Sequence, residues 1–178
     1  MRSLRAALAA AAMLFLLALV PARGEEQPLR EWKDKPTPRL ALKDLAGKPV
    51  DLASLKGRVV LVNFWATWCE PCIAEMPSIQ RLETKLGGKP FAVLAVNYGE
   101  STAKVEKWLQ KSGVTLHVLL DPDTEAAEAW GAKGLPMTFL VDAGGHVRYQ
   151  TYGERDWTGA GTVALVEKLV AEAPRAGR

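Results

Sequence analysis

Hydrophobic residues are grouped along the chain in short runs, separated by polar or glycine-containing segments. Residues 58–65 and 91–97 are nearly continuous apolar runs rich in β-branched side chains, which is typical of strands buried on both faces. Together with shorter runs they predict five strands, over residues 58–65, 91–97, 116–120, 137–141 and 147–151. The last two strands flank a glycine-containing turn, which is a strong hairpin signal.

The segments between and after these strands predict four helices, over residues 70–86, 101–112, 123–130 and 158–173. Apolar residues at the spacing of an amphipathic helix mark residues 101–112 and 158–173. Two further short apolar segments, residues 40–42 and 49–52, surround a turn and predict a small N-terminal hairpin. Strands that alternate with helices and end in a hairpin predict an α/β domain, with a central sheet of mixed direction flanked by helices.

The first residues have the layout of an export signal. Arg2 and Arg5 precede an uncharged apolar run of 15 residues over 6–20, and small residues follow it. A membrane-spanning helix needs about 20 apolar residues. We therefore interpret residues 1–24 as a signal peptide, with an uncleaved membrane anchor over residues 5–22 as the alternative. Either interpretation predicts a periplasmic or otherwise extracytoplasmic protein.

Composition bounds the rest of the chain. Residues 25–38 are polar, contain three prolines and predict a linker, which leaves residues 39–174 as one domain. Hydrophobic residues make up 48% of the sequence, which suffices for a packed core. The net charge is only +3, and the sequence has no basic cluster of the kind that binds nucleic acid. We therefore predict no nucleic-acid partner.

The chain has two cysteines, Cys69 and Cys72, in the segment Trp-Cys-Glu-Pro-Cys. They are three positions apart, so they cannot link distant parts of the fold. An exported protein lies where disulfides persist, so two cysteines that can pair only with each other predict a redox centre that needs no cofactor. A half zinc site is the main alternative, but His117 and His146 lack the spacing of further ligands, and we predict no metal.

The two cysteines fall at the junction of a predicted buried strand and a predicted helix. The first turn of a helix has free backbone N–H groups and a positive dipole end, which favour the thiolate of Cys69. Cys72 lies one turn deeper, within reach of a disulfide, and Pro71 suits the first helical turn. We therefore expect Cys69 to attack substrate disulfides and Cys72 to resolve the mixed disulfide.

Glu70 lies between the two cysteines and bears on the direction of the reaction. Its carboxylate opposes formation of the Cys69 thiolate and so destabilises the reduced form. Each ~1.4 kcal/mol lost from the reduced form lowers a two-electron potential by about 30 mV. The sequence therefore favours a reductant. A thiol oxidase or isomerase, and a non-catalytic copper- or metal-binding thiol module, are the alternatives.

Residues 64–72, Phe-Trp-Ala-Thr-Trp-Cys-Glu-Pro-Cys, resemble the thioredoxin superfamily and, more narrowly, the TlpA/ResA/CcmG group of envelope thiol–disulfide oxidoreductases. The resemblance extends from Leu40 to about Val170, and it implies a thioredoxin-like fold in which residues 101–120 form the central insertion of the TlpA-like group. It places Pro77 inside the active-site helix. It also implies that the bond between Leu135 and Pro136 is cis and that its backbone pairs with an incoming peptide.

The same resemblance implies further site residues. Glu75 matches a glutamate beside the active site of ResA-like proteins, and one helical turn separates it from Cys72. If partly buried it would have a raised pKa and could carry the thiol proton; a solvated helix carboxylate is the alternative. Asn63 replaces the buried acid of thioredoxin. Trp68 is expected to form an apolar rim for the substrate, whereas Trp65, Trp108, Trp130 and Trp157 are interpreted as packing or partial surface.

The resemblance also implies partners. Cysteine-containing envelope proteins would be the substrates, for example the haem-binding cysteines of apocytochrome c or the copper-site thiols of an oxidase assembly factor. A membrane thiol donor of the CcdA/DsbD type would supply electrons. We expect the domain to act as a monomer.

Overall fold

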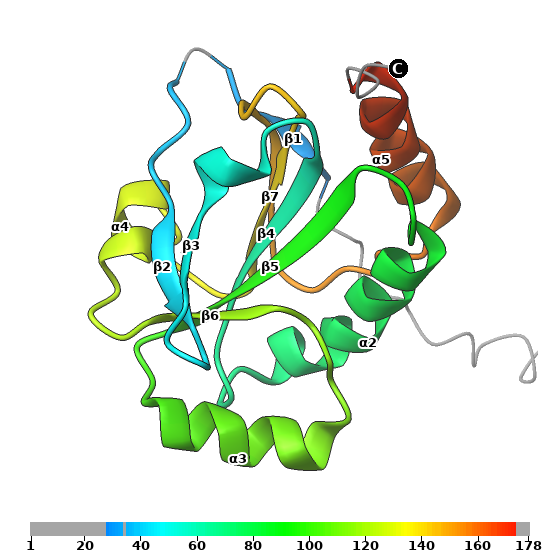
Figure 1. The fold of residues 1–178 in the computed structure, drawn as a ribbon. Helices are drawn as coiled ribbons and strands as arrows, with labels where there is room; N and C mark the ends of the chain where they lie inside the picture. Colours follow the sequence, from blue (N-terminus) through cyan, green and yellow to red (C-terminus); the bar gives the residue numbers. More distant parts are fainter. Residues whose placement is uncertain (1–27, 34, 174–178) are drawn as a thin grey trace, which may run out of the picture.

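The computed structural model of the chain describes residues 28–33 and 35–173 (Figure 1). Its strands are β1 (Arg30–Glu31), β2 (Ala41–Asp44), β3 (Pro49–Asp51), β4 (Val59–Trp65), β5 (Phe91–Tyr98), β6 (Val118–Asp121), β7 (Met137–Val141) and β8 (Val147–Tyr152). Its helices are η2 (Leu52–Leu55, a 3-10 helix), α2 (Glu70–Lys85), α3 (Thr102–Ser112), α4 (Glu125–Trp130) and α5 (Ala160–Glu172). The predicted signal or anchor segment, residues 1–24, lies outside the described residues.

All of these strands belong to one sheet, in the order β1-β8-β7-β4-β5-β6-β2-β3. The three strands β4, β5 and β6 run parallel, and the other pairings are antiparallel. The sheet is therefore mixed, as the sequence predicts. The structure also confirms the N-terminal hairpin, formed by β2 and β3, and shows that the predicted central insertion forms α3 and β6.

The central strand β4 is buried along its whole length because both faces of the sheet are covered. Its alternating side chains enter two separate hydrophobic clusters, as the two-residue period of a strand requires. Leu61 and Trp65 join the cluster that includes residues of α2 and α5, whereas Val62 and Phe64 join the cluster that includes Trp130 of α4. Figure 1 shows α2 and α5 on one side of the sheet and α4 on the other.

The register of the strands brings one end of four of them together. Phe64, at the end of β4, lies opposite Met137, the first residue of β7, and Met137 lies opposite Tyr152, the last residue of β8. Trp65 in turn lies beside Asn97 near the end of the parallel strand β5. The chain that follows β4 therefore emerges at the sheet edge where β7 begins and where β5 and β8 end.

The strand β1 was not predicted. Arg30 pairs with Gln150 and Glu31 with Tyr149 of β8, and the Trp32 ring packs edge-on against Phe139 at 5.7 Å between centroids. The prediction of a linker over residues 25–38 is therefore wrong for these residues, which extend the sheet. A strand of two residues is too short to show a hydrophobic period. Within residues 28–33 and 35–173, no helix is long and apolar enough to cross a membrane.

Candidate redox site

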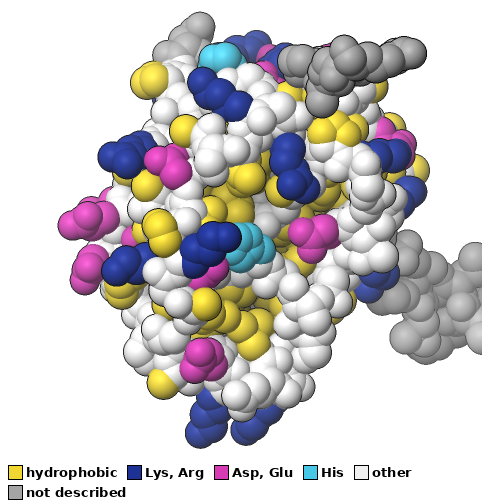
Figure 2. All heavy atoms as spheres, viewed as in Figure 1, with side chains coloured by type: hydrophobic (Ala, Val, Ile, Leu, Met, Phe, Trp, Pro, Cys, Tyr) yellow, Lys and Arg dark blue, Asp and Glu magenta, His cyan; other side chains and the backbone are white. Residues whose placement is uncertain are grey.

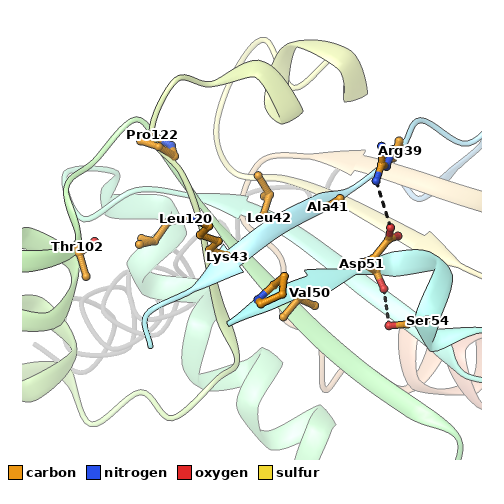
Figure 3. Close-up of a pocket in the computed structure, with 11 residues that line it drawn as sticks. Arg39, Ala41, Leu42, Lys43, Val50, Asp51, Ser54, Thr102, Leu120 and Pro122 are labelled. Carbon is orange, nitrogen blue, oxygen red and sulfur yellow. Dashed lines mark hydrogen bonds and ion pairs between the residues drawn. The ribbon is translucent and has the colours of Figure 1, made fainter. Parts of the chain in front are cut away.

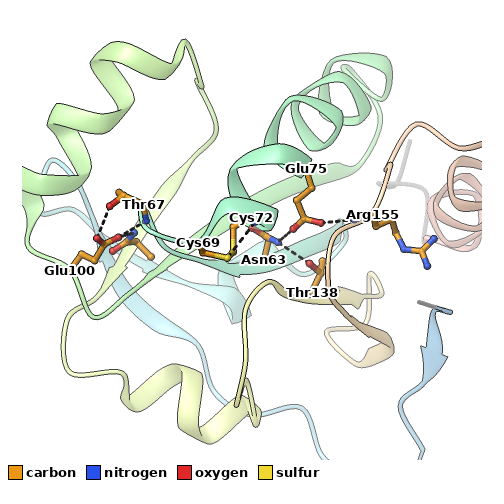
Figure 4. The surroundings of a disulfide bond; sticks show 9 residues. Asn63, Thr67, Cys69, Cys72, Glu75, Glu100, Thr138 and Arg155 are labelled. Atoms are coloured by element: carbon orange, nitrogen blue, oxygen red, sulfur yellow. Dashed lines mark hydrogen bonds between the residues drawn. A yellow bond between two sulfur atoms is a disulfide. The ribbon is translucent and has the colours of Figure 1, made fainter. Parts of the chain in front are cut away.

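The two cysteines form a disulfide at the N-terminal end of α2, with 5.3 Å between their Cα atoms (Figure 4). Cys69 is the N-cap residue: its backbone is extended, with φ −93° and ψ 97°, and α2 begins at the next residue. The backbone N–H of Cys72 donates to Sγ of Cys69 at 3.3 Å. A sulfur atom thus occupies the place where an N-cap side-chain oxygen usually accepts, which is where a negative charge is stabilised.

The two sulfur-bearing residues differ in exposure. Cys69 has 6% of its surface exposed to solvent and Cys72 has none. Of the two cysteines, only Cys69 is therefore accessible to a sulfur atom of another protein. Trp68, which precedes Cys69, is 60% exposed, one of two large hydrophobic side chains that are exposed in the described part of the chain. Glu70 and Pro71 are exposed as well. The pair thus consists of an outer cysteine, Cys69, and an inner cysteine, Cys72.

The peptide bond between Leu135 and Pro136 is cis, as the family resemblance implied. Pro136 immediately precedes β7, so it lies at the same sheet edge as the segment that carries Cys69. Its carbonyl oxygen accepts a hydrogen bond from the backbone N–H of Gly153 at 2.9 Å.

Glu75 is buried on α2 with only 1% of its surface exposed, so the alternative of a solvated carboxylate does not hold. Its Oε1 accepts from Nδ2 of Asn63 at 2.7 Å. Its Oε2 accepts from the backbone N–H of Arg155 and from Nε1 of Trp157, each at 3.2 Å. Burial raises the pKa of Glu75 to about 7, although the hydrogen bonds from Trp157, Asn63 and Arg155 oppose the rise.

Asn63 connects Glu75 to the strand that follows the cis proline. Its Nδ2 also donates to Oγ1 of Thr138 at 2.8 Å, so the amide joins α2, β4 and β7 (Figure 4). Its Oδ1 is buried and has no hydrogen-bond partner among the described residues. Rotating the amide by half a turn would present this oxygen to Glu75. The Asn63 amide can therefore donate a hydrogen bond to Glu75 when Glu75 is ionised and accept one from Glu75 when it is protonated.

No sequence signal marks Trp157, Arg155 or Thr138 as site residues. The sequence predicts packing or partial surface for Trp157, but this residue is fully buried and its ring N–H reaches the Glu75 carboxylate. These three residues follow Glu75 by 63 to 82 positions, and only the fold brings Arg155 and Trp157 to Glu75 and Thr138 to Asn63. Of the other tryptophans, Trp65 and Trp130 are buried and pack in the two hydrophobic clusters, as expected.

A hollow lies apart from the cysteine pair, between the β2–β3 hairpin and β6 (Figure 3). It measures about 800 Å³ and is mainly lined by apolar side chains such as Leu42, Val50 and Leu120. Figure 2, in the view of Figure 1, shows hydrophobic side chains among charged ones on this side of the molecule. No residue predicted for the redox site lines the hollow, so it is not part of that site. The described residues contain no group of three or more His, Cys, Asp or Glu side chains that could hold a metal ion.

A mixed sheet with a cysteine pair at the start of α2 and a cis proline at the same edge defines a thioredoxin-like domain with a paired-cysteine motif. The chain belongs to the Redoxin family, whose model matches residues 32–170. It is 38% identical over 110 residues to the thiol-disulfide oxidoreductase ResA of Bacillus subtilis (strain 168), a match that covers 62% of each chain. This relative is therefore matched over less than two thirds of its own length.

Other comparisons agree with this family. ResA of Bacillus thuringiensis (strain Al Hakam) is 35% identical over 121 residues, which cover 68% of this chain and 70% of the relative. A solved thiol:disulfide interchange protein of the thioredoxin family from Chlorobium tepidum TLS is similar with a TM-score of 0.63 and 27% identity, covering 81% of this chain and 99% of that one. The thioredoxin domain of a thiol-disulfide oxidoreductase from Bacteroides vulgatus gives a TM-score of 0.67 at 25% identity, covering 76% and 96%. These findings confirm the predicted fold.

Proposed function

We propose that the protein is an extracytoplasmic thiol–disulfide oxidoreductase that reduces disulfides in other proteins. The observation that carries the proposal is the unequal cysteine pair at the N-terminal end of α2, with Cys69 at the surface and Cys72 buried. The family and the relatives named ResA support the chemistry. The remainder of the site, above all the buried carboxyl group of Glu75, suits the transfer of a thiol proton.

The first step uses the outer cysteine. The thiolate of Cys69 attacks one sulfur of a substrate disulfide, forms a mixed disulfide with it and releases the other substrate sulfur as a thiolate. The N-terminal end of α2 stabilises the attacking thiolate by about 0.3–1 kcal/mol, and by up to ~2 kcal/mol where the group is partly buried. The exposed Trp68 supplies apolar surface for the substrate polypeptide, and the backbone around Leu135 and Pro136 pairs with it.

The second step uses the inner cysteine. Cys72 loses its proton, attacks Sγ of Cys69 and releases the second substrate thiolate, which leaves the protein oxidised and the substrate reduced by two electrons. Glu75 lies one helical turn beyond Cys72 on α2 and accepts the proton when its carboxyl group is ionised. A pKa of about 7 lets this group gain and lose a proton near neutral pH, as a proton carrier must.

The charges around the cysteines favour the reducing direction. Glu70 is in the first turn of α2, beside Cys69, and its carboxylate disfavours the thiolate. Destabilising the reduced form lowers the reduction potential, so the dithiol gives up its electrons more readily. The N-terminal pattern, read as a signal peptide or as an anchor over residues 5–22, supports a location outside the cytoplasm. Substrates would be envelope proteins such as apocytochrome c or copper-site assembly factors, and a membrane donor of the CcdA/DsbD type would reduce the monomeric domain again.

The trapping of a substrate tests this proposal. Replacing the inner cysteine in Cys72→Ser removes the second step, so a mixed disulfide through Cys69 should accumulate when the reduced variant meets oxidised envelope proteins. The trapped partners are identified by mass spectrometry after non-reducing electrophoresis. The variant Cys69→Ser, which keeps only the buried thiol, is the matched control and should trap none. Equal trapping by the two variants, or none by either, would refute the proposed roles.

A further inference from the structure

A second buried carboxylate, that of Glu100, lies at the same edge of the sheet and has no part in the proposed reaction. The strand β5 ends at Tyr98, and Gly99 turns the chain with φ 67°, a conformation that a residue with a side chain rarely adopts. Glu100 follows directly, before α3 begins, and retains only 5% of its surface. Figure 4 shows its carboxylate pointing to Thr67 in the segment that leads into the disulfide.

Each carboxylate oxygen of Glu100 has two polar partners. Oε2 accepts from the backbone N–H of Thr67 at 2.7 Å and from Nδ2 of Asn97 at 2.8 Å. Oε1 accepts from the hydroxyl of Thr67 at 2.7 Å and lies 2.8 Å from Nζ of Lys104. Burial alone would raise the pKa of Glu100, but the hydrogen bonds from Lys104, Thr67 and Asn97 outweigh it and lower the pKa. The group is thus a charged acceptor with its bonding sites filled.

Residues 66–68 connect β4 to Cys69; Ala66 packs in the hydrophobic cluster that contains Trp65, and few hydrogen bonds hold the segment. Within the segment, the backbone N–H of Cys69 donates to the carbonyl of Ala66 at 3.2 Å. The side chain of Trp68 is exposed and faces solvent. The backbone and hydroxyl of Thr67 therefore provide the polar connection between this segment and the neighbouring strand end, through the Glu100 carboxylate.

We propose that Glu100 is a positioning residue. By fixing the segment 66–68, Glu100 keeps the sulfur of Cys69 at the N-terminal end of α2. In the oxidised protein the bond to Cys72 also holds this sulfur. In the dithiol that bond is absent, so the contacts of Thr67 with Glu100 have to keep Cys69 where the helix end stabilises its thiolate. The inference rests on the proposed function, because it matters only if Cys69 is the attacking thiol.

The test measures the pKa of the Cys69 thiol through the pH dependence of its alkylation by iodoacetamide. The parent is the full chain with Cys72→Ser, in which Cys69 is the single thiol. Glu100→Gln removes the charge of the acceptor, and Thr67→Val removes only the hydroxyl donor and keeps the charge. Both should raise the pKa of Cys69 by about half a unit, which is about a threefold loss of thiolate below the pKa. Thr67→Ser, which keeps both donors, should retain the parent value, as should Lys104→Met, which removes the half-exposed partner of Glu100.

The other outcomes separate the explanations. If Glu100→Gln lowers the pKa of Cys69 and Thr67→Val leaves it unchanged, Glu100 acts only through its charge and the positioning role is refuted. If both variants lose thermal stability but keep the parent pKa, Glu100 only anchors the fold, which also refutes the role. Should one variant fail to fold, the other still decides. If the Cys72→Ser parent traps no mixed disulfide with oxidised envelope proteins, the proposed function itself is contradicted, whereas the pKa shifts of the variants test only the positioning role.

Discussion

Replacing Glu75 by glutamine should remove a pH-dependent loss of stability from the oxidised protein. The carboxyl group is buried, and its pKa is raised from 4.5 to about 7. A raised pKa means that the folded state binds the proton more tightly than the unfolded state does. The resulting stabilisation is fully present below pH ~4.5 and is lost as the pH rises through the folded-state pKa of about 7. Glutamine has nearly the shape of the carboxyl group and carries no charge at any pH.

The size of the effect follows from the difference in pKa. A rise from 4.5 to about 7 corresponds to about 3 kcal/mol over the full pH range, at 1.36 kcal/mol per pKa unit. Roughly 2–3 kcal/mol of this falls between about pH 5 and pH 9, and most of it is lost before about pH 7–8. At acid pH the variant and the natural protein should therefore have nearly the same free energy of unfolding. At alkaline pH the variant should be the more stable of the two by roughly 2–3 kcal/mol.

The assay is urea unfolding of the oxidised protein at a series of pH values, followed by tryptophan fluorescence and circular dichroism. The free energies of unfolding of the natural protein and of Glu75→Gln should diverge as the pH rises. Glu106→Gln, which neutralises an exposed carboxylate on α3, is the matched control and should run parallel to the natural protein. Parallel curves for Glu75→Gln as well would refute the raised pKa and, with it, the basis for Glu75 as a proton carrier near neutral pH.

Three other variants test parts of the same site. Trp157→Phe removes a donor that lowers the pKa of Glu75, so the pH midpoint of the stability loss should move upward, and the variant should lose about 1–3 kcal/mol above neutral pH; an unchanged midpoint in urea unfolding would contradict this. Asn63→Asp places a second carboxyl group at the 2.7 Å contact with Glu75, so the drop in stability between acid and alkaline pH should exceed that of the natural protein by about 2 kcal/mol or more; an equal drop would count against the contact. Trp68→Ala should raise KM severalfold for a protein disulfide and leave the rate with a small disulfide unchanged, and equal effects on both substrates would exclude a role in substrate binding.

The elements most accessible to sequence analysis are those with a strong hydrophobic period. β4 and β5 are buried over nearly their whole lengths, so their continuous apolar runs identify them. The turn between β7 and β8 likewise identifies a hairpin. By contrast, β1 owes its existence to hydrogen bonds with β8 and to the packing of Trp32, and two residues carry no period. Contacts distant in sequence form such an element, so its own residues do not predict it.

The same distinction applies to the site. Cys69, Cys72 and Glu75 follow from local spacing on one helix and from a family resemblance, and the structure places all three on or next to the first turns of α2. The family resemblance places Asn63 at the position of a buried acid, but the contacts of Asn63 and Trp157 with Glu75 do not follow from the sequence, because Asn63 precedes Glu75 by 12 positions and Trp157 follows it by 82. Trp157 in particular looks like a core residue in the sequence. Only the fold shows that its N–H points to a buried carboxylate.

The reduction potential of the Cys69–Cys72 pair decides whether the protein reduces disulfides or donates them. The chain would be equilibrated in thiol–disulfide buffers of known potential, its free thiols alkylated, and the oxidised fraction measured by mass spectrometry. We predict one two-electron transition below about −200 mV, on the side of the reducing thioredoxins at about −270 mV. A transition near about −120 mV, the value of a strong oxidant, would show that the protein donates disulfides and does not reduce them.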